Sequence, residues 1–306
     1  MSRLRAVGLF VGLASLWGLS FPAISVGLNS LDPLLFAAIR YDIAAALLLT
    51  LALVTLGPER WIPQTRDDVA AIVSGGLFLV AGNSMLFVAQ QTVASGVAAI
   101  LYSLIPLLTT GFAFVVLRER MGAVQLLGIA VGLVGVAIVA RPDPNALLSA
   151  DVVAKGFVVV AAASVALGGV LVQRFGPTLH DVGFTGWAMG AGALVLHAGS
   201  LATGETVPTT LPDQEVLLAV GYLSVLATAL AFVLYFTLLG DYGPLRTNLV
   251  SYLVPVVATV AGVVLLDERI TALTLLGFLV IFAGFLLVQS DTIRALARER
   301  ATGGEA

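Results

Sequence analysis

Residues 97–120, VAAILYSLIPLLTTGFAFVVLRER, resemble residues 246–269, RTNLVSYLVPVVATVAGVVLLDER, which lie 149 positions further along the chain. Extended to residues 97–139 and 246–288, the alignment needs no gap, and fourteen of its forty-three positions are identical. The aligned pairs include Pro106 with Pro255, Glu119 with Glu268, Gly128 with Gly277 and Gly135 with Gly284. An apolar composition alone matches Leu, Val and Ala by chance, but it does not align these residues at fixed spacing. The chain therefore contains two copies of one unit.

The composition indicates a chain that lies in a lipid bilayer. Hydrophobic residues make up 59% of its 306 residues and charged residues 11%, and the mean hydropathy is +1.05. Soluble domains carry about 25% charged residues, so a soluble fold of this size would lack the charges to cover its surface. Large domains outside the membrane are excluded, because the apolar segments occupy most of the length.

Ten apolar segments, each near the roughly 20 residues that a membrane span requires, predict an all-α membrane protein with ten transmembrane helices. They cover residues 5–28, 33–56, 69–91, 95–117, 122–140, 152–174, 182–203, 215–239, 244–266 and 271–289. Each copy holds five spans, an odd number, so the second copy enters the membrane in the opposite sense to the first. The predicted organisation is a five-helix repeat over residues 1–141, an inverted repeat over residues 150–290, and a cytoplasmic tail over residues 291–306.

The positions of the cations predict the orientation, because cytoplasmic loops retain Lys and Arg. With the N-terminus inside, eleven of the fifteen cations fall in cytoplasmic segments and three in outer ones, while Arg40 lies within a span. We expect a multi-pass protein of the plasma membrane with both termini in the cytoplasm.

Several classes of function are excluded or disfavoured. The net charge of −3 and the lack of a basic run before the tail argue against nucleic-acid binding. The absence of cysteine, the presence of only two histidines, and the absence of a phosphate-binding loop leave no basis for a metal site or a cofactor. Tyr41-Asp42 and Leu239-Gly240-Asp241 superficially resemble an intramembrane aspartyl protease pair, but Leu238 stands where that motif has glycine. We do not expect an enzyme.

Several motifs resemble the EamA-type family of the drug/metabolite transporter superfamily. They are Leu16–Ile24 (LWGLSFPAI), Pro33–Tyr41 (PLLFAAIRY), and the run from Leu249 to Pro255 with the following Asp267-Glu268-Arg269. The resemblance implies ten helices in two inverted five-helix bundles that move small metabolites, often outward, through a cavity formed by spans 1, 3, 4, 6, 8 and 9. Asp42 stands where the family pattern has an apolar residue.

Polar and aromatic side chains recur at helical spacing within these spans, and polar residues in a span usually face the protein interior or a water-filled cavity. The candidates for substrate binding are Trp17, Asn83, Gln90, Tyr102, Ser103, Thr228, Tyr235, Asn248, Ser251 and Tyr252. The alternative is that they join helices by hydrogen bonds, worth about 0.6 kcal/mol each on average.

Two prolines and two charges within the spans are further candidates. Pro106 and Pro255 predict helix kinks, because a mid-helix proline removes a backbone hydrogen bond. Arg40 is a candidate for a structural charge whose long side chain could extend toward the outer surface. Asp42, two residues on, is a candidate for a protonatable coupling site.

These observations predict a secondary transporter that exports small metabolites, such as amino acids or related amphipathic solutes, by alternating access. Its partners would be the small-molecule substrate and the lipid bilayer. A flippase for lipids or lipid-linked sugars is the alternative. The small-residue series Gly128, Gly132, Gly135 and Gly186, Gly190 permits close helix contact, either within one chain or in a homodimer.

Overall fold

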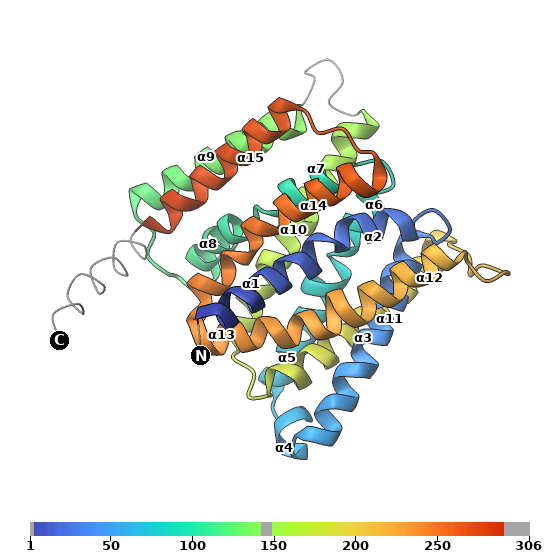
Figure 1. Cartoon of the computed structure of the whole chain (residues 1–306). Coiled ribbons are helices and arrows are strands. Elements are labelled where there is room, and N and C mark those ends of the chain that lie inside the picture. Colours follow the sequence, from blue (N-terminus) through green and yellow to red (C-terminus); the bar gives the residue numbers. More distant parts are fainter. Residues whose placement is uncertain (1–2, 142–148, 291–306) are drawn as a thin grey trace.

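The computed structural model describes residues 3–141 and 149–290, and every regular element in these ranges is a helix (Figure 1). The first copy contains α1 (Arg3–Gly18), α2 (Ser20–Gly27), α3 (Pro33–Thr55), α4 (Pro58–Trp61), α5 (Arg66–Ser74), η1 (Gly75–Ala81), α6 (Ser84–Ala89), α7 (Ser95–Tyr102), α8 (Ile105–Val116) and α9 (Ala123–Ala140). The second contains α10 (Ala150–Phe175), α11 (Asp181–Thr203), α12 (Gln214–Gly221), η2 (Tyr222–Leu230), α13 (Ala231–Asn248), α14 (Val250–Leu266) and α15 (Ala272–Val288).

Seven helical stretches within the described residues are long and apolar enough to cross a membrane. They are Val7–Gly27, Pro33–Thr55, Arg66–Ala89, Ser95–Val116, Ala123–Ala140, Ala150–Phe175 and Gln214–Gly243. The prediction of an all-helical, multi-pass membrane protein is therefore confirmed. The shorter apolar helices α14 and α15, together with the 23-residue α11, coincide with the remaining three predicted segments.

Several of the predicted spans are interrupted rather than continuous. The first bends between α1 and α2, and the fourth breaks at Ser103 and Leu104, between α7 and α8. Pro106 accordingly lies in the first turn of a new helix, where its missing N–H costs nothing. Pro255 instead lies inside the uninterrupted helix α14. The two equivalent prolines thus occupy different local structures.

Helices α9 and α15 lie side by side at one edge of the molecule, and glycines bring their backbones together (Figure 1). A Cβ added to Gly128 would meet the carbonyl oxygen of Gly284 at 2.6 Å, and one added to Gly284 would meet that of Gly128 at 2.5 Å. Gly135 and Gly277 approach each other in the same way, with the Gly277 oxygen 2.8 Å from a Cβ on Gly135. These glycine positions are filled by helices of the same chain.

Carboxylates from loops bind the N-terminal backbone amides of helices in the other copy. Glu205 accepts hydrogen bonds from the amides of Leu34 and Leu35, at the start of α3. Glu268 accepts from the amides of Ser95 and Gly96, at the start of α7. Helix N-termini carry unsatisfied N–H groups and a partial positive charge, so a carboxylate stabilises them.

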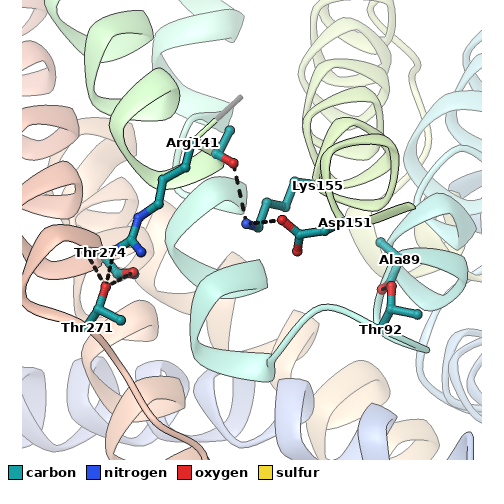
Figure 2. A network of polar contacts seen from close by, with 8 residues as sticks. Ala89, Thr92, Arg141, Asp151, Lys155, Thr271 and Thr274 are labelled. Atoms are coloured by element: carbon teal, nitrogen blue, oxygen red, sulfur yellow. Dashed lines mark hydrogen bonds and ion pairs between the residues drawn. The ribbon is translucent and has the colours of Figure 1, made fainter. Parts of the chain in front are cut away.

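The loops that contact one another fall into two groups. In one group, Thr206 donates its backbone N–H to Asp32, and the guanidinium of Arg141 donates to Thr271. Figure 2 shows this Arg141 contact beside Lys155, whose ammonium lies 2.7 Å from Asp151 and donates to the Ala140 carbonyl. The second group contains three cross-copy contacts. They are His180 N–H to the Arg60 carbonyl, Thr178 N–H to Asp68, and the Arg174 guanidinium to the Val116 carbonyl.

Candidate substrate-binding site

Arg40 is buried between the two copies. Its side chain is only 7% exposed, although its length would have allowed it to extend outward. Its Nε donates a hydrogen bond of 2.8 Å to Oγ1 of Thr228, which lies in η2 of the second copy. The guanidinium carbon stands 5.1 Å from the ring centre of Tyr41 and 5.8 Å from that of Phe87. A cation within about 6 Å of an aromatic face is attracted to it.

A hydrogen-bonded chain of three side chains lies in the same core. Asn83 donates from Nδ2 to the Tyr41 hydroxyl at 2.8 Å, and its Oδ1 accepts from the Tyr102 hydroxyl at 2.6 Å. Asn83 is 8% exposed and stands at the start of α6 without capping that helix. These hydrogen bonds join α3, α6 and α7. The ring of Tyr41 also packs against the Arg40 guanidinium, so these three side chains and the Arg40–Thr228 pair form one group. We call this group the core polar network (Arg40, Tyr41, Asn83, Tyr102 and Thr228).

Both copies contain a π-helical segment next to this network. The first, η1, ends two residues before Asn83, and the second, η2, contains Thr228. Shifting η1 by 149 positions places it on residues 224–230, within η2, so the two segments are equivalent. Short π-helical segments inside α-helices occur frequently at functional sites. Helical spacing in the sequence did not reveal them, because that spacing assumes 3.6 residues per turn throughout.

An aromatic cluster (Trp17, Phe232, Tyr235 and Phe236) is built around residues that follow Thr228 along the chain. The Trp17 ring lies 5.5 Å from Tyr235 and 6.0 Å from Phe232, and Tyr235 lies 5.5 Å from Phe236. Phe232 follows Thr228 by four residues along the same span, which places the cluster about one helical turn from the Arg40 contact. Trp17 and Tyr235 were predicted as site residues, whereas Phe232 was not.

The remaining predicted site residues do not join this group. Gln90 donates to the Phe21 carbonyl at 3.0 Å, and its Oε1 is buried with no partner among the described residues. The Ser103 hydroxyl donates to the Ile100 carbonyl of its own helix. The ring of Tyr252 packs 4.1 Å from that of Phe285, and its hydroxyl is buried without a described partner. Ser251 is half-buried, and the side chain of Asn248 lies outside the described residues.

Asp42 lies on the other side of α3 from Arg40, as its two-residue separation along a helix requires. Its carboxylate contacts His197 on α11, and both side chains are partly exposed. Neither His197 nor Tyr41 was predicted from the sequence as a site residue. For Tyr41, its position next to Arg40 in the sequence could have indicated it. Among the described residues, no group of three or more His, Cys, Asp or Glu could hold a metal ion.

Comparison with known proteins places the chain in a transporter family. The model of the EamA-like transporter family matches the chain twice, over residues 4–141 and 154–290. The chain belongs to the EamA-like transporter family. The resemblance seen in its sequence motifs is thus confirmed. The family and the names of the relatives below indicate a transporter rather than an enzyme.

The relatives of this EamA-like chain include inner-membrane transporters. It is 32% identical to the uncharacterized inner membrane transporter YedA of Escherichia coli K12, over 92% of this chain and 89% of the relative. It is 28% identical to a probable amino-acid metabolite efflux pump of Salmonella typhimurium LT2, over 92% and 94% of the two chains. A protein of known crystal structure has the same fold, with a TM-score of 0.65, 21% identity, and coverage of 94% of this chain and 98% of that one.

Proposed function

We propose that this protein is a secondary transporter that exports small amphipathic metabolites by alternating access between its two copies. The observation that carries the proposal is the buried hydrogen bond between Arg40 of the first copy and Thr228 of the second. Substrate sites of transporters built from repeats lie near the midplane, at the interface between the repeats. The core polar network occupies such an interface.

Two features support ten spans in two inverted repeats. Gly128 contacts Gly284, the equivalent of Gly135, while Gly135 contacts Gly277, the equivalent of Gly128. Exchanging the copies therefore reproduces the contact, which is the property of a two-fold axis. The loop contacts described above also agree with ten spans. In a ten-span topology, the two residues of each contact lie on the same side of the membrane. The cation count then supports a cytoplasmic position for both termini.

The chemistry of the site supports a substrate with one polar and one apolar end. The core polar network offers the guanidinium of Arg40, whose described hydrogen bond uses only Nε, and the aromatic cluster begins about one turn away. Metabolites of amino acids have this character, and a relative is named as a probable efflux pump for them. The buried hydrogen-bonding groups of the core polar network favour a small solute over a lipid.

Transport can be tested with the purified protein in liposomes preloaded with a panel of unlabelled amino acids and related carboxylic acids. The labelled form of each solute is then added outside, and its uptake in exchange for the unlabelled solute inside is measured. This exchange needs no ion gradient. We expect exchange of at least one amphipathic member, and its loss in Thr228→Val. Protein-free liposomes are the control. Movement of fluorescent lipid analogues without any solute exchange would overturn the proposal in favour of a flippase.

A further inference from the structure

The charge of Arg40 has no counterion in the described part of the chain. The guanidinium carries five N–H groups, and the hydrogen bond to Thr228 uses only the one on Nε. No described carboxylate lies within 4.0 Å of its nitrogens. Buried charges in proteins are normally paired, because removing an ion from water is costly. A cation that is 93% buried therefore calls for an anion from outside the described chain.

The nearby acidic residue does not supply this anion. Asp42 is two positions from Arg40 but is turned to the other side of α3, where it contacts His197 at 2.7 Å. Lys155 shows the ordinary arrangement, because its side chain is 13% exposed and its ammonium lies 2.7 Å from Asp151. Of these two largely buried cations, Lys155 is neutralised by a described carboxylate and Arg40 is not.

The groups around Arg40 orient it without neutralising it. Thr228 holds Nε, which leaves the two terminal nitrogens free of that bond. The rings of Tyr41 and Phe87 stand 5.1 and 5.8 Å from the guanidinium carbon, and both are uncharged. A guanidinium held in this way presents parallel N–H groups that match the two oxygens of a carboxylate.

We propose that Arg40 binds the carboxylate of the transported solute, while the aromatic cluster receives its apolar end. The assignment rests on the proposed transport function and narrows its substrate class to amphipathic organic acids. Thr228, which orients the guanidinium, lies four residues from Phe232, about 6 Å along the helix. An aryl or branched alkyl group two or three carbons from a carboxylate spans that distance.

Three probes with one apolar group and different polar ends test the charge requirement. They are 3-phenylpropanoate, 3-phenylpropan-1-ol and 3-phenylpropylamine, each added to the purified protein while its thermal unfolding is followed. A ligand that binds only the folded state raises the unfolding temperature. We expect stabilisation by the acid alone. Equal stabilisation by all three, or preference for the amine, would overturn the assignment.

Variants locate the effect at Arg40. We expect Arg40→Gln to weaken binding of 3-phenylpropanoate by about 10- to 150-fold, the range for a lost hydrogen bond to a charged group. Arg40→Lys keeps the positive charge but loses the parallel N–H groups of the guanidinium. Its affinity for 3-phenylpropanoate should therefore lie between those of the wild type and Arg40→Gln. Lys155→Gln removes a cation that Asp151 already neutralises, and should bind as the wild type does. If Arg40→Gln does not fold, Thr228→Val tests the same site, because it leaves the guanidinium intact but unoriented.

The outcomes separate this assignment from the transport function itself. Exchange of neutral or cationic solutes in liposomes, with no effect of Arg40→Lys on their affinity, would overturn the anion site and leave transport standing. Lowered stability of Arg40→Gln, combined with unchanged affinity for 3-phenylpropanoate, would make Arg40 purely structural. Stabilisation by the acid without exchange of any solute would support the anion site and contradict transport.

Discussion

The Oδ2 atom of Asp42 lies 2.7 Å from Nε2 of His197, and the pair joins α3 to α11. Asp42 follows the start of α3 by nine residues, about 14 Å of helical rise, so it lies near the middle of a 23-residue apolar helix. Ionisable side chains at this depth are costly, and proton relays of transporters are built from them. The contact gives the predicted coupling site at Asp42 a second protonatable group.

Neutralising this pair should separate coupled transport from exchange. We expect Asp42→Asn to abolish accumulation driven by a proton gradient while leaving the exchange of 3-phenylpropanoate largely intact. His197→Gln should act in the same direction, because it removes the other member of the pair. Both activities are measured in liposomes, with and without an imposed pH gradient. Equal loss of accumulation and exchange would assign the pair to packing instead.

Removing the Asn83 amide should destabilise the protein. Asn83→Leu leaves the buried hydroxyls of Tyr41 and Tyr102 without their partner, and an unsatisfied buried group costs about 1–3 kcal/mol. The free energy of unfolding should fall by that amount. Ser84→Ala is the matched control, because the Ser84 hydroxyl is also buried but bonds only the Ala81 carbonyl of its own segment. Unchanged stability with a 5- to 150-fold loss of affinity would make Asn83 a ligand contact.

The contact between α9 and α15 should tolerate no side chain at its glycines. We expect Gly128→Ala to lower the free energy of unfolding by about 1–3 kcal/mol, the range for overpacking, because the new Cβ would meet backbone atoms of α15. Gly169→Ala on α10 is the control, since nothing lies within 4 Å of its added Cβ. There the higher helix propensity of Ala should leave stability unchanged or raised. Similar effects at both positions would contradict the close approach.

The proposed orientation can be measured because the chain has no cysteine. Single cysteines at Ser30 and Thr209 should react with an impermeant thiol reagent added to intact cells. A cysteine at Glu59 should react only after permeabilisation. All three side chains are exposed in the structure, and the parent chain supplies a background without thiols. The reverse pattern of labelling would place both termini outside.

The sequence predicted the helical membrane fold well because apolar length and turn residues are local signals. The sequence predicted only a kink at Pro106, whereas the helix breaks before it. A proline within an apolar segment is compatible either with a bend in one helix or with the start of a new helix. The two π-helical segments were missed. In η1, Gly75 and Gly76 lie where an added Cβ would meet α11, and no local sequence pattern encodes that contact.

The candidate site was predicted in part. Asn83, Tyr102 and Thr228 lie in the core polar network, and Trp17 and Tyr235 lie in the aromatic cluster. The place of Arg40 in that network was not expected, and Tyr252 packs against α15 instead. Spacing along one helix shows which side chains share a face, but not which neighbouring helix that face contacts. The Asp42–His197 contact joins residues 155 positions apart, so it depends on the pairing of α3 with α11.

The reciprocal glycine contact between α9 and α15 also bears on how such a chain arises. A contact in which each partner supplies the same two positions is the interface of a homodimer. Two separate five-helix proteins, inserted in opposite directions, would form it without any further adaptation, and joining their genes would leave it unchanged. In such a homodimer, a single mutation at the glycine equivalent to Gly128 would damage both ends of the interface. In a joined chain it would damage only one, so joining would let the two copies differ, as they do where Arg40 of one bonds Thr228 of the other.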